Sequence, residues 1–198
     1  DPSAGLLKKT RERLSGKADC ILGSASHIPG ANNKFDIAVS GPALNYFPDL
    51  NIAFAEMKRV LKKNGTIAAY VWDYADRMDF LRLFWDAAGE VDANARKLNQ
   101  GIRFPLCNKD NLREIFQKAG LANVETSYLD IDTIFKNFDD YWNPFFGGQG
   151  PAPNYLTAQP GDVQDEIKNN IIKKLLVEQD GAIKLMARAI AVKGTYKS

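Results

Sequence analysis

Two segments of the sequence carry side chains that could take up a proton or cradle a positive charge. Asp73 and Tyr74 follow an apolar stretch, and either could accept a proton from an oxygen or nitrogen nucleophile, although their spacing does not require this role. Aromatic faces attract cations. The rings that could do so are Trp72 and Tyr74 in one segment and Tyr141, Trp142, Phe145 and Phe146 in the other. The alternative is that these rings simply fill the core beneath long loops.

The cysteines and the histidine match no metal or redox pattern. Cys20 and Cys107 lie far apart and form neither a C-x-x-C pair nor a disulfide framework, so we expect reduced, buried thiols. His27, the single histidine, falls in a loop rich in Ser, Gly, Asn and Pro, where a polar loop residue is a better interpretation than a catalytic base. No metal site is expected.

Composition and charge narrow the class of protein. With 198 residues and 45% hydrophobic content, the chain can form one core, so a single domain over residues 1–198 is expected. The 26 basic and 24 acidic side chains form no long run of one sign, which argues against a nucleic-acid partner. The apolar stretch 67–72 is too short to span a membrane, and no signal-peptide pattern appears. We therefore expect a cytoplasmic protein without a membrane partner.

The first part of the chain alternates between helical and strand-like patterns. It predicts a helix over 2–14, a short strand over 18–22 and a buried strand over 35–40. A helix that starts at Asp49 and ends at the turn 62–65 is followed by a second buried strand over 66–72. A strand, a helix and a strand joined by short loops indicate a right-handed parallel crossover.

The remainder has longer loops. Helical periodicity covers 77–90, 108–119 and about 162–177, and the segments 123–135 and 181–194 are expected to form a pair of strands.

This order of elements, with its motifs, resembles the C-terminal three quarters of a class I S-adenosylmethionine-dependent methyltransferase. The resemblance covers essentially the whole chain and implies an α/β, Rossmann-like sheet, mostly parallel, with a C-terminal antiparallel strand pair and an N-terminal truncation. The residues that carry it are Asp1; Gly23, Ser24, Ala25, Ile28 and Pro29; Phe35, Asp36, Ala38 and Ser40; Leu44, Phe47 and Asp49; and Arg59, Val60, Leu61, Lys62, Lys63, Asn64 and Gly65.

The resemblance implies a set of residues that bind S-adenosyl-L-methionine. Asp1 would accept hydrogen bonds from the ribose hydroxyls. Ser24 stands where the family usually has an Asp that accepts the adenine amine, and it is a weaker, uncharged acceptor. Gly41 would allow a close approach of the methionine part. The whole implied set is Asp1, Pro2, Ser24, Ala25, Ser40 and Gly41.

The family pattern also has a first strand, a glycine-rich turn, a first helix and most of a second strand before the position of Asp1. We therefore expect either that a longer functional protein supplies these elements or that this chain compensates for them. Domain swapping, a homodimer, or direct pairing of the segments 18–22 and 35–40 would be such compensations.

The implied function is in-line transfer of a methyl group to a small or medium organic acceptor, which needs mainly positioning and exclusion of water. Residues 1–72 would be the rest of the cofactor-binding half, and residues 73–198 would cover the substrate. The implied substrate-binding residues are Trp72, Tyr74, Tyr141, Trp142 and Phe145. The alternative function is a non-catalytic, truncated methyltransferase-like module that associates with itself and binds no cofactor. A nicotinamide dehydrogenase fragment is less well supported, because no hydride-transfer pair is evident.

Overall fold

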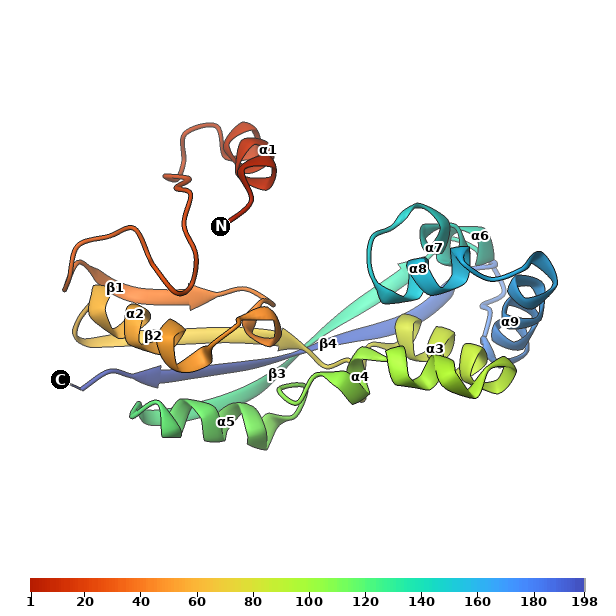
Figure 1. Cartoon of the computed structure of the whole chain (residues 1–198). Helices are drawn as coiled ribbons and strands as arrows, with labels where there is room; N and C mark the ends of the chain where they lie inside the picture. Colours follow the sequence, from red (N-terminus) through yellow and green to blue (C-terminus); the bar gives the residue numbers. More distant parts are fainter. Residues whose placement is uncertain (198) are drawn as a thin grey trace. The chain divides into compact units, whose positions relative to one another are not determined.

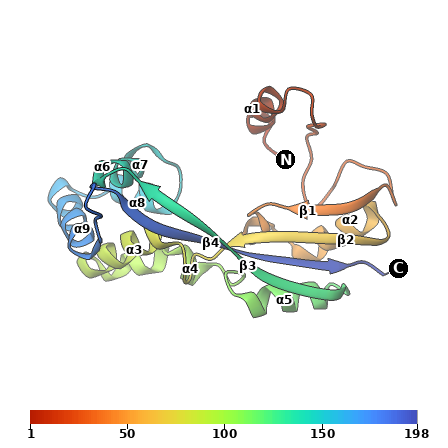
Figure 2. The ribbon, with the colours of Figure 1, turned by 180° about the vertical axis from the view of Figure 1, so that it is seen from behind.

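The computed structural model describes residues 1–197 and contains a four-stranded sheet (Figure 1). Its strand order is β1-β2-β4-β3, with the bounds β1 Phe35–Ser40, β2 Leu61–Trp72, β3 Ala122–Phe135 and β4 Ile183–Thr195. β1 and β2 are parallel, and the register pairs Ile37 with Thr66 and Ser40 with Ala69. β3 and β4 run in opposite directions (Figure 2). The predicted fold class, with its parallel crossover and C-terminal antiparallel pair, is confirmed.

The longer helices lie close to the predicted segments, and two of them begin at a side-chain cap. The side-chain oxygen of Ser3 accepts a hydrogen bond from the Leu6 amide, and Asp49 accepts two from the first turn of its helix. The helices are α1 Ala4–Leu14, α2 Leu50–Val60, α3 Asp79–Val91, α4 Gln100–Arg103, α5 Lys109–Lys118, α6 Phe138–Trp142, α7 Pro144–Gly147, α8 Pro151–Thr157 and α9 Gly161–Lys174, with 3-10 turns η1 Leu44–Tyr46 and η2 Ala93–Leu98. No helix within residues 1–197 is long and apolar enough to cross a membrane.

Two sequence predictions need correction. Residues 18–22 form no strand in the described chain, because no neighbouring strand pairs with them. The Ile21 carbonyl oxygen accepts a hydrogen bond from the Asp1 amino group, and the Cys20 carbonyl oxygen accepts one from the Arg11 side chain. α2 ends at Val60, before the predicted turn, and β2 begins at Leu61, where it already pairs with Phe35. Asn64 does adopt the left-handed conformation expected of it, with φ 63°, but inside β2.

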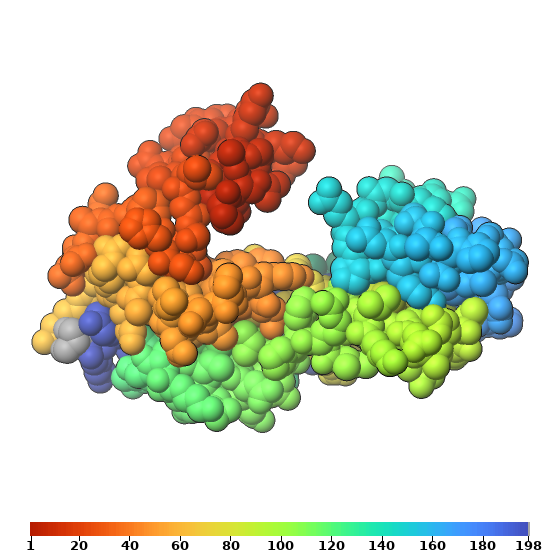
Figure 3. All heavy atoms as spheres, viewed as in Figure 1, coloured from red at the N-terminus to blue at the C-terminus, as the bar shows by residue number. Residues whose placement is uncertain are grey.

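The chain divides into two compact units. Unit 1 comprises residues 1–70, 112–126 and 192 onward, and unit 2 comprises residues 71–111 and 127–191. In unit 1, Phe54 and Phe116 meet edge to face with ring centroids 5.1 Å apart. In unit 2, the α3 and α8 segments pack directly on each other, as the space-filling view shows (Figure 3). The predicted division at residue 72 into a cofactor-binding and a substrate-covering half stays a prediction.

Candidate functional site

In unit 1, two backbone hydrogen bonds join Asp1 to residues 21–23, although they form no regular β-bridge. The Gly23 amide donates to the Asp1 carbonyl oxygen at 3.2 Å, and the Asp1 amino group donates to the Ile21 carbonyl oxygen at 3.5 Å. These two bonds flank Leu22, as in a parallel strand pair. The Asp1 side chain is exposed, and its Oδ1 accepts a hydrogen bond from the Ser3 amide at 2.7 Å. Within the described residues its Oδ2 makes no hydrogen bond.

The loop that follows Gly23 turns back tightly on itself. A Cβ at Gly23 would lie 2.5 Å from Cδ of Pro29, so the close approach of this proline requires glycine. Ser24 and His27 exchange backbone hydrogen bonds of 3.4 and 3.2 Å, which leaves the Ser24 side chain exposed and Ala25 half-buried. The structure thus brings Ser24 and Ala25 into the segment that directly follows the backbone partner of Asp1.

Arg59 of α2 fixes the far part of this loop, and we did not identify it as a functional residue from the sequence. Its NH1 donates to the Gly30 carbonyl oxygen and to Asn32 Oδ1, and its NH2 donates to the Ile28 carbonyl oxygen, each at 2.8 Å. Glu56, one helical turn earlier, accepts a hydrogen bond from the Ile28 amide at 2.9 Å. Both side chains therefore act on the backbone of the loop that carries Ser24 and Ala25.

Arg59 and Glu56 also pair with each other in a fork geometry. Arg59 Nε donates to Glu56 Oε1 at 2.7 Å, and Arg59 NH2 donates to Glu56 Oε2 at 2.8 Å. The hydrogen bond from Arg59, followed by that from the Ile28 amide, lowers the pKa of Glu56 from 4.5 to about 2. The Glu-x-x-Arg spacing was the available sequence signal. This spacing predicts an ion pair on one helix face, but it does not indicate which loop the two side chains would bind.

Ser40 and Gly41 end β1 in unit 1. Ser40 is buried, and its hydroxyl donates to the Gly41 carbonyl oxygen at 3.1 Å. A Cβ at Gly41 would lie 3.6 Å from the Tyr70 hydroxyl oxygen, which is an ordinary contact. Packing within the protein therefore does not demand glycine at this position.

In unit 2, Asp73 directly follows β2 and is buried, with 4% of its surface exposed. Its Oδ1 accepts a hydrogen bond from the Asp76 amide at 3.1 Å, and its own amide donates to the Arg188 carbonyl oxygen. Burial raises the pKa of Asp73, while the Asp76 amide and the charges of Arg188 and Arg77 act in the opposite direction. A carboxylate with a raised pKa is a stronger proton acceptor than an ordinary aspartate.

The backbone after Asp73 is held by helix α4. A Cβ at Gly101 would lie 2.5 Å from the Tyr74 carbonyl oxygen and 2.7 Å from Cα of Ala75, so only glycine permits this approach. The rings of Tyr74 and Phe104 lie 5.9 Å apart. Trp72 and Tyr74 are half-buried, which leaves part of each ring accessible.

The second group of predicted substrate-binding aromatics lies in the core of unit 2. Tyr141 is 1% exposed, and Trp142 and Phe145 are each 4% exposed, whereas Phe146 is 47% exposed. Phe145 stacks on Phe84 with ring centroids 4.6 Å apart. This burial favours the core-filling alternative for Tyr141, Trp142 and Phe145, and their role in substrate binding stays a prediction.

Residues 1–197 contain neither a candidate metal site nor a disulfide. No group of three or more His, Cys, Asp or Glu side chains among them is arranged to hold a metal ion. Cys20 and Cys107 are both free thiols; Cys107 is buried, as expected, but Cys20 is only half-buried.

Comparison with known proteins finds similarity to methyltransferases. Residues 1–69 match the family model described as a methyltransferase domain. A demethylmenaquinone methyltransferase of Desulfitobacterium hafniense (strain Y51) is 29% identical over 150 residues, which cover 66% of this chain and 57% of that protein. One from Staphylococcus carnosus (strain TM300) is 29% identical over 140 residues, which cover 63% and 57%. The chain thus spans a little over half the length of the curated relatives that it matches.

Solved structures share the fold at low sequence identity. The YcgJ protein from Bacillus subtilis has a TM-score of 0.56 and 15% identity, covering 100% of this chain and 81% of that one. A SAM-dependent methyltransferase from Thermotoga maritima has a TM-score of 0.51 and 18% identity, covering 100% and 72%. Residues 1–69 thus match a methyltransferase domain, and the chain shares its fold with a solved S-adenosylmethionine-dependent methyltransferase.

Proposed function

We propose that this chain is the C-terminal part of a cytoplasmic enzyme that transfers a methyl group from S-adenosyl-L-methionine to a small or medium organic acceptor. The observation that carries the proposal is the pairing of the Asp1 backbone with residues 21–23. It aligns the exposed Asp1 carboxylate with the segment that continues into Ser24 and Ala25. These are the residues that a ribose and an adenine would need.

The residues of unit 1 suit the proposed cofactor. The Asp1 carboxylate would accept hydrogen bonds from the ribose hydroxyls, and its Oδ2 is available for them. Ser24 and Ala25 would contact the adenine, with Pro2 beside Asp1. Ser40 and Gly41 would lie beside the methionine part, which gives a reason for a glycine that packing does not require. When bound, the cofactor supplies a methyl group already activated by its sulfonium.

The residues after β2 would hold the acceptor and manage its proton. Asp73, with its raised pKa, is the stronger candidate for a general base, and Tyr74 is the weaker one. Trp72 and Tyr74 would contact the acceptor with the exposed parts of their rings. Because the curated relatives are named as demethylmenaquinone methyltransferases, we propose as the acceptor an apolar ring compound of quinone type in its reduced quinol form, which is electron-rich enough to attack the methyl group and has a proton to give up.

Titration calorimetry of the 198-residue chain with S-adenosylhomocysteine tests the cofactor part of the proposal. We expect saturable binding with a dissociation constant on the order of micromolar. Asp1→Ala should weaken it at least about tenfold, since a charge-assisted hydrogen-bond acceptor is lost. Asp19→Ala removes another exposed carboxylate of unit 1 and should leave binding unchanged.

Sedimentation of the same samples distinguishes the remaining possibilities. Binding by a species of twice the chain mass would support the proposed homodimer. A folded chain that binds no S-adenosylhomocysteine would contradict the proposed activity and favour the non-catalytic module.

A further inference from the structure

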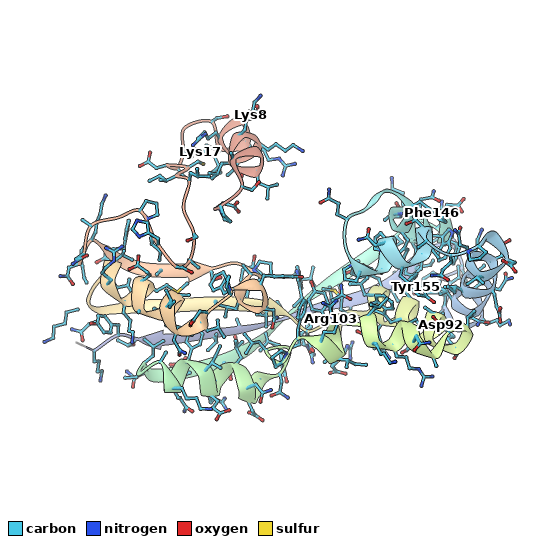
Figure 4. All side chains as sticks on the ribbon, viewed as in Figure 1. Lys8, Lys17, Asp92, Arg103, Phe146 and Tyr155 are labelled. Atoms are coloured by element: carbon cyan, nitrogen blue, oxygen red, sulfur yellow. The ribbon has the colours of Figure 1, made fainter. Side chains whose placement is uncertain are left out.

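Unit 2 contains an open groove between the end of η2, helix α4 and helix α8. Its volume is about 500 Å³, and its lining includes Leu98, Arg103, Pro151, Tyr155 and Ala158. Figure 4 labels Arg103 on α4 and Tyr155 on α8, which both contribute side chains to this part of unit 2. Leu98 and Ala158 are exposed, so the groove offers apolar surface to solvent. It was not recognised from the sequence, because its walls come from separate segments.

Arg103 gives the groove its charge. Within residues 1–197 the Arg103 guanidinium makes no hydrogen bond or ion pair. It lies over the Phe104 ring, with its central carbon 6.0 Å from the ring centroid. Arg188 of the same unit shows the contrast: it binds Asp130 through two bonds of 2.6 and 3.0 Å. The planar guanidinium of Arg103 therefore keeps its donors available for an acidic oxygen.

Tyr155 contributes an uncharged side chain to the lining of the groove. Its hydroxyl donates to Asp92 Oδ2 at 3.4 Å, and burial, followed by the Asp92 charge, raises the pKa of Tyr155. The phenol therefore stays protonated in neutral solution. Asp92 does not line the groove, and its Oδ1 accepts a hydrogen bond from the Asn94 amide at 2.9 Å. An anion in the groove would thus face Arg103 without an acidic side chain among the lining residues.

We propose that this groove binds the part of the methyl acceptor that lies away from Trp72 and Tyr74, and that this part carries an acidic oxygen on a flat apolar body. Phe104 connects the two places, because its ring lies 5.9 Å from that of Tyr74 and 6.0 Å from the Arg103 guanidinium.

The oxygen, from a carboxylate or a phenolate, pairs with Arg103, and the apolar body lies against Leu98, Pro151 and Ala158. The identification of the bound compound as the methyl acceptor rests on the methyl transfer proposed above. The binding itself does not rest on it, because the groove is lined by residues of unit 2 alone.

Two small probes of the same shape test the charge requirement. 2-Naphthoate carries a carboxylate, and 2-naphthamide replaces it with a neutral amide. Binding to the full chain is measured by calorimetry and by ligand-observed NMR, without cofactor. We expect the naphthoate to bind at least about tenfold more tightly than the naphthamide, because only the former forms a charge-assisted pair with Arg103. Equal affinities, or no binding of either probe, would overturn the proposal.

Three substitutions test whether the probes bind in this groove. Arg103→Gln should reduce the affinity for the naphthoate to that for the naphthamide. Lys97→Gln removes a cation of η2 that does not line the groove, and it should change neither. Ala158→Trp, at an exposed position, should fill the groove and abolish binding of both probes while circular dichroism shows a folded chain. A naphthoate preference that survives Arg103→Gln would overturn the assignment.

The cofactor titration separates this inference from the proposed function. Naphthoate binding that depends on Arg103, in a chain that fails to bind S-adenosylhomocysteine, would support the groove as an anion-selective site and contradict the methyl transfer. The opposite result would leave the methyl transfer standing and overturn the groove.

Discussion

The two units hold their functional segments by different physical means. In unit 1 the loop over residues 23–33 is fixed by hydrogen bonds to one ion pair, Arg59 and Glu56, on the surface of α2. In unit 2 the helices are fixed by stacked and edge-on rings, such as Phe84 of α3 against Phe145 of α7 and Tyr155 of α8. Hydrogen bonds at a partly exposed site depend on geometry and pH, whereas apolar packing depends on volume. The loop in unit 1 should therefore be the adjustable part and the aromatic core of unit 2 the rigid one.

The largest effect is expected from removing a ring of unit 2. Phe84 is completely buried, so Phe84→Ala should lower the free energy of unfolding by about 3–5 kcal/mol through lost burial and a remaining cavity. Urea denaturation followed by tryptophan fluorescence measures the loss. Phe146→Ala, at a ring that is 47% exposed, is the matched control and should cost much less. Similar losses for both variants would contradict a core centred on Phe84.

Adding one methyl group at Gly101 should come next. Gly101→Ala places a Cβ against the backbone of Tyr74, and overpacking of this kind costs about 1–3 kcal/mol. Gly161→Ala is the control, because a Cβ there meets no atom within 4 Å. Thermal unfolding of both variants tests the difference. An unchanged Gly101→Ala variant would show that the segment 73–75 is not held as described.

A smaller and more local effect is expected in unit 1. Arg59→Gln removes the guanidinium that binds the Ile28 and Gly30 carbonyl oxygens, so hydrogen exchange at the Ile28 amide should accelerate by about tenfold. Lys62→Gln removes an exposed cation paired with Asp36 and should leave this exchange rate unchanged. Equal exchange in both variants would mean that the loop is held by other contacts.

The pH dependence should be the smallest effect and should belong to unit 1. The folded-state pKa of Glu56 is about 2, below its ordinary value of 4.5, so its stabilising contribution is present above pH 4.5 and is lost as the pH falls towards 2. Glu56→Gln should therefore be less stable than the parent at pH 6, and the difference should shrink on acidification to pH 2. Urea denaturation across this range measures it. A difference independent of pH would contradict the role of the carboxylate.

The sequence predicted those features that depend on local signals. The helix α2 follows from the cap at Asp49 and from periodic apolar residues, both within a few positions of each other. The segment 18–22 has strand-like residues, but a strand also needs a partner strand, and within residues 1–197 the segment has only the backbone contact with Asp1. The family resemblance implied that Asp1, Ser24 and Ala25 belong to one cofactor site, and this assignment stays a prediction. The role of Arg59 was not predicted, because its contacts with Ile28, Gly30 and Asn32 span about thirty positions.

The contact at Gly101 has a consequence for how the proposed acceptor-binding surface could change during evolution. Helix α4 touches the main chain of Tyr74 and Ala75, and it does so without depending on which side chain stands at position 74. The contact that holds the backbone of this segment therefore does not involve the side chains that the segment exposes. A library of substitutions at Tyr74 that keeps Gly101 should therefore yield many folded proteins, each losing the packing of the Tyr74 ring on Phe104.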